Sequence, residues 1–352
     1  MQLRAERQRR KTAPGATIRD VAARAGVSPM TVSRVINGEV NVRPRTRDIV
    51  NGVIRELSYA PNPAARSLAG FAPSRIGLLY DNPSTGFLSE FLIGVLDESS
   101  RTGLQVVPER RLEHETSLAA LERLLSSGVD GVVLPPPLCE SPEMLAAVRD
   151  AGAVAIALAP GRPSEEMATL RIDNRAAAFE LTQHLLDLGH RRFGFTRGHP
   201  NQTVSDQRLE GFLAAVTAAG IDPDTVGLEQ GYFTYRSGLR AAARLLARNP
   251  RPTAIFAAND DMAAATLTVA HQLGLAVPQD ISVVGFDDTP IASIVWPALT
   301  TIRQPIAAMA RTAVDLVVED MRRRRRGEGQ PRQCLHPHVL VVRESTGPAP
   351  KA

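Results

Sequence analysis

One short stretch near the N-terminus, TIRDVAARAGVSPMTVSRVING at residues 17–38, restricts what this chain can fold into more than any other. Thr17 and Asp20 have the spacing of a capping box, in which two side chains satisfy the free N–H groups at a helix start. Gly26 is expected to end that helix, because glycine takes the left-handed conformation without steric cost. Four apolar residues at helical spacing lie in between: Ile18, Val21, Ala22 and Ala25.

A second short helix is expected directly after this turn. Ser28 caps it, and Pro29 occupies its first position, where a missing N–H costs nothing. The periodicity buries three residues, Val32, Val35 and Ile36, and exposes four, Met30, Thr31, Ser33 and Arg34. A later stretch places five apolar residues on one helical face, Ile49, Val50, Val53, Ile54 and Leu57. Three such helices indicate a helix-turn-helix domain, whose second helix enters the major groove of DNA. A helical hairpin used only for packing is the alternative.

The charge of the chain is distributed unevenly. Residues 1–70 hold 13 Lys and Arg against 5 Asp and Glu, whereas residues 71–352 hold 28 against 32. A basic N-terminal segment followed by an acidic remainder is typical of a nucleic-acid-binding module joined to a second domain, although a solvated basic tail gives the same distribution of charge. The basic arm at residues 1–16 is predicted to add salt-sensitive phosphate contacts. The Arg322–Arg326 run is interpreted as a solvated helix end rather than a second such patch.

Several function classes are excluded by what the sequence lacks. The two cysteines, Cys139 and Cys334, stand far apart, so neither a disulfide framework nor a zinc site is expected, and no metal or cofactor is predicted. No apolar run approaches the ~20 residues of a membrane span, and the N-terminus has no signal-peptide pattern, so a cytoplasmic protein is expected. Enzyme motifs such as GxSxG or a P-loop are absent.

From about residue 74 the chain alternates short apolar strands with helices. RIGLLY, LQVVPE, GVVLPPP, AVAIAL and TLRID are followed by further strand segments at RRFGFTRG, PTAIFAAND and ISVVGFDD, with helices expected from Arg175, Asp206 and Asp261. This order predicts two doubly wound parallel-sheet lobes. Because ligands bind such folds beyond the carboxyl ends of the strands, a ligand cleft between the lobes is expected.

The N-terminal residues TIRDVAARAGVSPMTVSRVINGEVNVRPRTRDIVNGVIRELSYAPNPAARSLAG closely resemble the DNA-binding headpiece and hinge of the lactose/galactose repressor (LacI/GalR) family. LLDLGHRRFGF, DQRLEGF, IFAANDDMA, ISVVGFDDT and PALTTIRQP are similar to motifs of its effector domain, which is related to periplasmic sugar-binding proteins. The resemblance covers nearly the whole chain. It implies a ligand-responsive transcriptional regulator.

The resemblance also implies a DNA-contacting set. Pro29, Met30 and Arg34 are expected to face base edges, and Arg34 can bind guanine O6 and N7 in a bidentate manner. Leu68, in a hinge helix, is expected to act as an apolar wedge between base steps in the minor groove, or else to be part of an ordinary linker. The full set is Thr17, Ser28, Pro29, Met30, Thr31, Ser33, Arg34, Asn37, Asn62, Leu68 and Ala69.

For the effector, the resemblance implies a pocket that suits a polyhydroxylated ring, since charged and amide groups pair with hydroxyls while an aromatic ring covers the apolar face. Its predicted residues are Tyr80, Phe87, Arg208, Phe233, Asn259, Asp287 and Gln304. Phe233 could instead belong to the core. Ala159 and Pro160 stand at a strand end where many relatives have an acidic residue or arginine, which puts the usual polar contact there in doubt.

The expected protein is a homodimeric repressor that binds a pseudo-palindromic double-stranded DNA operator under the control of a small molecule, a sugar or glycoside in the first instance. A purine or other metabolite as effector, a solute-binding protein without DNA function, and an enzyme on the same scaffold are the alternatives. The expected domains are an arm (1–16), a helix-turn-helix domain (17–60), a hinge (61–73), an effector and dimerisation domain (74–346) and a tail (347–352). Within the effector domain, the first lobe covers 74–173 and 305–335, and the second covers 174–304 and 336–346.

Overall fold

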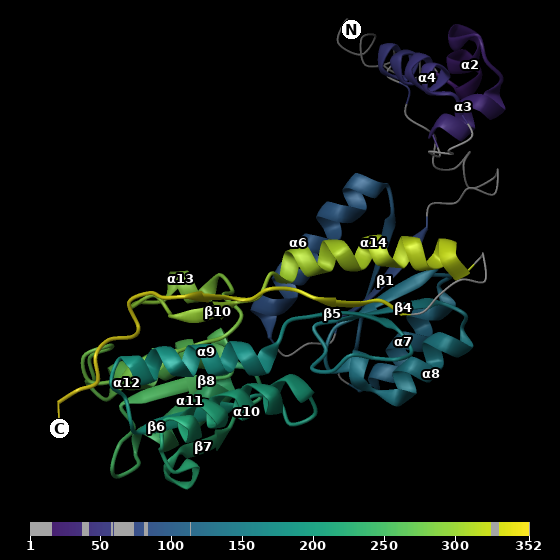
Figure 1. The fold of residues 1–352 in the computed structure, drawn as a ribbon. Coiled ribbons are helices and arrows are strands. Elements are labelled where there is room, and N and C mark those ends of the chain that lie inside the picture. The colour runs from purple at the N-terminus through teal and green to yellow at the C-terminus, as the bar shows by residue number, and fades with distance from the viewer. Residues whose placement is uncertain are drawn as a thin grey trace, which may run out of the picture. The chain divides into compact units, whose positions relative to one another are not determined.

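The computed structural model describes residues 16–36, 42–57, 59, 74–80, 84–112, 114–324 and 331–351. The chain divides into two compact units, Met1–Pro73 and Ser74–Ala352. The first unit is helical, and the second is built on two separate parallel sheets flanked by helices (Figure 1). The fold class expected from the sequence is therefore confirmed.

The N-terminal unit contains three helices around a small aliphatic core: α2 (Ile18–Ala25), α3 (Pro29–Ile36) and α4 (Pro44–Glu56). Thr17 and Asp20 form the predicted capping box, and Gly26 ends α2 with a φ of +67°. Val21, Val32 and Val50 are fully buried against one another. One prediction is wrong: Ile49 is 47% exposed, because α4 turns Val50 and Val53 to the core instead.

The first lobe of the second unit is a six-stranded parallel sheet with the strand order β11-β5-β4-β3-β1-β2. Its strands are β1 (Arg75–Tyr80), β2 (Gln105–Arg110), β3 (Gly131–Leu134), β4 (Val154–Leu158), β5 (Ala168–Arg171) and β11 (Gln333–Leu335). The central strands β3 and β4 are buried on both faces, as expected of parallel strands covered by helices on both sides.

Helices cover both faces of this sheet. They are α6 (Thr85–Thr102), α7 (Ser117–Ser126), α8 (Pro142–Asp150) and α14 (Ile306–Arg324), with the short turn η1 (Leu138–Glu140) after β3. Helices α6 and α14 lie side by side (Figure 1) and approach closely at Gly94, where an added Cβ would stand 2.2 Å from the carbonyl oxygen of Ala307. Only glycine fits at that crossing.

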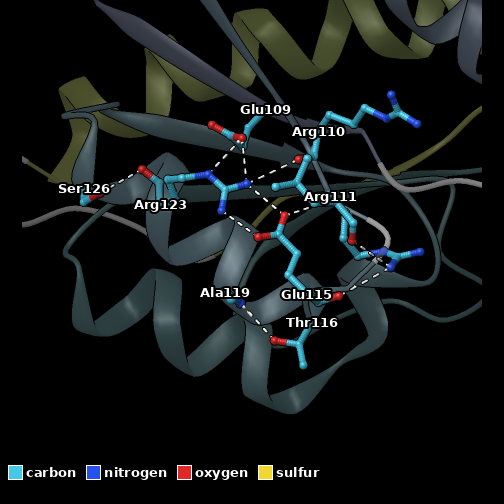
Figure 2. Close-up of polar contacts among 9 residues, drawn as sticks. Glu109, Arg110, Arg111, Glu115, Thr116, Ala119, Arg123 and Ser126 are labelled. Atoms are coloured by element: carbon cyan, nitrogen blue, oxygen red, sulfur yellow. Dashed lines mark hydrogen bonds and ion pairs between the residues drawn. The ribbon is translucent and has the colours of Figure 1, made fainter.

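A charged cluster ties the edge strand β2 to the loop before α7 (Figure 2). The Arg123 guanidinium donates to Glu109 at 2.8 Å and to Glu115 at 2.7 Å. Hydrogen bonding to Arg123 lowers the pKa of Glu115 to about 2. Charged side chains along an edge strand also discourage its pairing with another chain, so the cluster has a structural explanation.

The second lobe is a four-stranded parallel sheet with the order β7-β6-β8-β9. Its strands are β6 (Phe193–Arg197), β7 (Gly227–Gln230), β8 (Ala254–Ala257) and β9 (Ser282–Val284), and its helices are α9 (Asn174–Asp187), α10 (Thr203–Ala218), α11 (Tyr235–Leu246), α12 (Asp260–Gln272) and α13 (Ile291–Ile294), with the turn η2 (Pro223–Thr225). Phe195, Phe212 and Phe256 pack with ring centroids 5.0–5.8 Å apart and anchor the core.

The C-terminal segment runs along this second lobe. Strand β10 (Thr301–Arg303) pairs antiparallel with β12 (Val339–Val341). Beyond β12, the buried His190 imidazole lies 3.1 Å from the carbonyl oxygen of Gly347 and 3.0 Å from the hydroxyls of Thr253 and Ser282. Burial lowers the pKa of His190. Through these contacts His190 attaches the segment that follows β12 to the sheet of the second lobe.

Candidate functional site

The outer face of α3 carries the residues predicted to read base edges. Met30 is 63% exposed, and Pro29 and Arg34 are exposed beside it. Thr31 and Ser33 are half-buried. Val32 and Val35, on the opposite face of α3, pack into the core. This packing alone turns the face with Pro29, Met30 and Arg34 toward solvent.

Two residues of the predicted DNA-contacting set, Ser28 and Thr17, also serve as helix caps. The Ser28 hydroxyl accepts from the Thr31 N–H at 3.1 Å, and the Thr17 hydroxyl donates to Asp20 at 2.7 Å. This bond to Thr17 lowers the pKa of Asp20, so the carboxylate at the start of α2 stays ionised. The predicted residues Asn37, Asn62, Leu68 and Ala69, the hinge 61–73 and residues 1–15 of the arm lie outside the described residues.

A cavity lies between the two lobes of the second unit, at the carboxyl ends of their strands. It is partly open to solvent, and five of the seven predicted effector residues line it. The complete lining is Ser84, Phe87, Pro136, Ala159, Asn174, Gln202, Val204, Arg208, Phe233, Asp287 and Gln304. The structure thus brings together Phe87, Arg208, Phe233, Asp287 and Gln304. Three polar residues of the lining, Ser84, Asn174 and Gln202, were not predicted, and neither were Pro136 and Val204.

The centre of this pocket is a buried ion pair. Arg208 Nη2 lies 3.2 Å from Asp287 Oδ1, and both side chains are 5% exposed. Arg208 also donates to Asn174 Oδ1 at 3.0 Å and to the Ala258 carbonyl at 2.6 Å, and its guanidinium stacks 3.7 Å above the Phe286 ring. These contacts satisfy the buried cation and fix its orientation.

Asp287 faces the pocket as an anion with spare acceptor capacity. Its Oδ1 accepts from Gln304 Nε2 at 2.6 Å as well as from Arg208, and within the described part of the chain Oδ2 accepts no hydrogen bond. Burial raises the pKa of Asp287 to about 6, against the opposing effect of Arg208. Asp287 has a φ of +107°, a conformation that side chains seldom adopt outside functional sites.

Hydrogen bonds to Asp260 stabilise the strained loop around Asp287. The Asp260 carboxylate accepts from the Thr289 N–H at 2.7 Å and from the Thr301 hydroxyl at 2.6 Å. Burial and the charge of Asp287 raise the pKa of Asp260 well above its usual range. Asp288 points elsewhere, to Arg303 and Arg343, each at 2.6 Å.

Phe233 is held in the pocket in a left-handed conformation, with a φ of +58°. Its ring lies on the backbone at Gly198, where an added Cβ would stand 2.0 Å from Phe233 Cζ. Its carbonyl oxygen accepts from Asn259 Nδ2 at 3.0 Å. This placement gives Phe233 a pocket position rather than a purely core one.

Asn259 does not line the pocket, unlike the other predicted residues of the second lobe. Its Oδ1 caps α12 by accepting from the Met262 N–H at 3.0 Å, and it is 1% exposed. Both ends of its amide are therefore used within the protein, so in this conformation it positions Phe233. Of Tyr80, the structure describes only the backbone, at the end of β1.

The first lobe contributes mainly apolar surface to the pocket. Phe87, Pro136 and Ala159 line it. Ala159 has a φ of +52° and presents only a methyl group, so it offers no polar side-chain contact at the position where the sequence put such a contact in doubt. Within the described ranges, no three histidine, cysteine or acidic residues gather in a group that could hold a metal ion. None of the described helices is long and apolar enough to cross a membrane.

Models of two protein families match this chain. Residues 17–62 match "Bacterial regulatory proteins, lacI family", and residues 182–346 match "Periplasmic binding protein-like domain". The HTH-type transcriptional regulator CelR of Thermobifida fusca is 36% identical and covers 97% of this chain and 99% of its own. The repressor PurR of Escherichia coli O1:K1 / APEC is 33% identical, over 95% of this chain and 98% of its own.

Solved structures match over the same span. A complex of the transcriptional regulator CelR with cellobiose is 33% identical with a TM-score of 0.67, covering 94% of this chain and 99% of that one. The lac repressor dimer bound to operator and the anti-inducer ONPF is 30% identical with a TM-score of 0.70, covering 95% and 100%. These similarities confirm the resemblance inferred from the motifs. The chain belongs to the LacI family of DNA-binding transcriptional regulators, which are not enzymes.

Proposed function

We propose that this protein is a repressor that binds a pseudo-palindromic operator as a homodimer and that a sugar or glycoside in the interlobe pocket controls this binding. The observation that carries the proposal is the Arg208–Asp287 pair, which lies in a cavity between two lobes beside Gln304 and Phe233. Amide, guanidinium and carboxylate groups match ring hydroxyls, and the aromatic rings cover an apolar ring face.

DNA reading is assigned to the outer face of α3. Arg34 is the residue that can discriminate a base by hydrogen bonding, whereas Met30 offers apolar contact to a thymine methyl. Thr17, Ser28, Thr31 and Ser33 are proposed to lie near phosphates, which position the helix without reading sequence. A salt-dependent affinity is expected from the phosphate contacts.

Dimerisation is supported by two apolar surfaces. On the second lobe, Trp296 is 80% exposed and Ile294 is 77% exposed, with the His271 ring 6.0 Å from Trp296. On α6, Ile93 and Leu96 are 46% and 53% exposed. Large exposed apolar side chains that cluster in this way mark interaction surfaces. A two-fold dimer would bury the same surfaces on both copies and would match a palindromic site.

The effector class is inferred from the pocket together with one relative, the CelR regulator solved in complex with cellobiose. The pocket's polar groups come mainly from the second lobe and its apolar groups from the first. A ligand with hydroxyls on one side and an apolar ring face on the other fits that division. Because only a ligand with different affinity for two states shifts an equilibrium, the sugar must favour one lobe arrangement.

The test is genomic footprinting of the tagged full chain, followed by binding to the recovered site at two salt concentrations with cellobiose, other sugars and purine bases. We expect a palindromic site whose affinity falls with salt and changes with one sugar. A response to a purine base alone would replace the sugar and keep the regulator. The absence of any specific site would contradict the proposed DNA-reading role.

A further inference from the structure

We propose that Glu140 is a positioning residue that reaches from the first lobe to cap helix α10 of the second lobe, and that it thereby holds the lobes in the arrangement that binds the effector. Glu140 ends the turn η1, which follows β3 of the first sheet. Helix α10 carries the pocket residues Val204 and Arg208. Only the consequence for effector affinity rests on the proposed function; the contact itself can be tested separately.

The Glu140 carboxylate accepts hydrogen bonds from both lobes. Its Oε2 accepts from the N–H of Thr203, the first residue of α10, at 3.0 Å, and its Oε1 accepts from the Thr203 hydroxyl. Oε1 also accepts from the N–H of Gly161, in the loop after β4 of the first lobe, at 2.8 Å. One carboxylate therefore joins the first-lobe strand ends to the start of a second-lobe helix.

Helix α10 lacks a side-chain cap of its own. Gln202 stands at its N-cap position and makes no capping hydrogen bond. The first N–H groups of a helix have no partner within the helix, and its N-terminus favours a negative charge. Glu140 supplies both the acceptor and the charge. This also explains why α10 begins at Thr203, three residues before the start expected from the sequence at Asp206.

The two lobes meet closely at this point. An added Cβ at Gly161 would stand 2.8 Å from the backbone nitrogen of Val204, so a larger residue would push α10 away. Gln207, one turn along α10, donates from Nε2 to the Gly161 carbonyl oxygen at 2.6 Å. Ala159, two residues before Gly161, offers only a methyl group. The negative charge at this contact between the lobes therefore comes from Glu140, in the turn that follows β3.

The contact has a consequence for binding. Arg208 lies on α10 and pairs with Asp287 in the pocket, so the position of the start of the helix influences the position of the guanidinium. If loss of Glu140 lowers the fraction of molecules in the lobe arrangement that binds the effector, the apparent dissociation constant of the effector rises by the same factor. Glu140 contributes to affinity in this way without contacting the effector.

The experiment is hydrogen exchange of the full-length protein, comparing wild type, Glu140→Gln and Glu140→Ala. Because the Thr203 and Gly161 N–H groups both donate to this carboxylate, we expect their exchange to be roughly tenfold faster in Glu140→Ala, with a smaller increase in Glu140→Gln. Glu143→Gln is the matched control. Glu143 is exposed at the start of α8, three residues away, and is expected to leave both amides unchanged.

Titration with cellobiose gives the second readout, and we expect its apparent dissociation constant to rise in both Glu140 variants. If wild type does not bind cellobiose, that sugar is excluded as the effector, while the exchange experiment still decides the role of Glu140. Unchanged exchange at Thr203 and Gly161 would overturn the proposal. So would uniformly faster exchange over both sheets, because Glu140 would then support the fold in general and not this lobe contact.

Discussion

The candidate residues of α3 and those of the effector pocket differ in how they relate to the fold. Met30 on α3 is 63% exposed, whereas the Arg208 and Asp287 side chains in the pocket are each 5% exposed. On α3 one set of residues, including Val32 and Val35, forms the core while another faces outward. In the pocket, the charged side chains proposed to bind the ligand also satisfy one another. Stability and the proposed function are therefore expected to be separable in the first region and coupled in the second.

The strongest test of this contrast is Arg208→Ala. It removes the partner of Asp287 and leaves a buried carboxylate unpaired, which lowers the free energy of unfolding by about 3–5 kcal/mol. The effector response is expected to disappear. Chemical denaturation of the full chain measures the first effect, and sugar titration of operator binding measures the second.

Arg244→Ala is the control for that variant. Arg244 pairs with Glu229 on the same lobe, but its side chain is 54% exposed, so its loss is expected to cost less than about 1 kcal/mol. An Arg208→Ala protein with wild-type stability and effector affinity would show that the pocket is not coupled to the fold and that the site is misplaced.

Gly198→Ala tests the same coupling without removing a charge. The new methyl group would stand 2.0 Å from Phe233 Cζ, so the ring must leave its place, at a cost of about 1–3 kcal/mol in stability. Effector affinity is expected to fall as well. In the N-terminal unit, Gly52→Ala meets no atom within 4 Å inside α4 and is expected to stabilise the fold by about 0.5–1 kcal/mol. Equal changes in thermal stability for the two glycines would contradict the contrast.

For the exposed region, Arg34→Ala should alter function alone. Loss of a bidentate contact to guanine is expected to cost about 1–3 kcal/mol of discrimination between operator and random DNA. The free energy of unfolding should change by less than about 1 kcal/mol, since Arg34 lies on the exposed face of α3. Competition binding with the two DNAs measures the first quantity. Unchanged discrimination would remove Arg34 from the proposed base-reading set.

The same contrast explains how much the sequence could predict. Local signals specify α2 and α3, since the capping box, Gly26 and Ser28 each act within a few residues. Most of the parallel strands were predicted from short apolar runs. The parallel strands β7, with the sequence GLEQ, and β11 and the paired strands β10 and β12 were not, because they are three or four residues long and depend on partners distant in the chain.

The pocket shows the same limit. Arg208 and Asp287 were found through motifs, but their pairing follows from the tertiary fold and has no signal in sequence spacing. Asn259 was expected in the pocket, whereas local capping of α12 and the Phe233 carbonyl use its amide. Glu140 has no sequence signature for its contact with Thr203, which lies 63 residues away along the chain. Contacts between distant segments therefore required the structure.

The smallest expected effect is a dependence of effector binding on pH. Burial raises the pKa of Asp287 to about 6, so the carboxyl becomes protonated in the folded protein as the pH falls through this value. If the effector needs the ionised form, its affinity is expected to be roughly tenfold weaker at pH 5 than at pH 7.

Acid unfolding through Asp287 would not explain such a loss. The folded pKa of Asp287 lies above the unfolded value, so the folded state binds more protons in this range and this group adds stability as the pH falls. Operator binding without effector should stay constant, since the Thr17 hydrogen bond lowers the pKa of Asp20 and residues 1–113 contain no histidine. Titrations at pH 5 and 7 with wild type and Asp287→Asn provide the measurement. A pH dependence that survives in Asp287→Asn would assign the titration to another group and would separate the pocket's chemistry from its central ion pair.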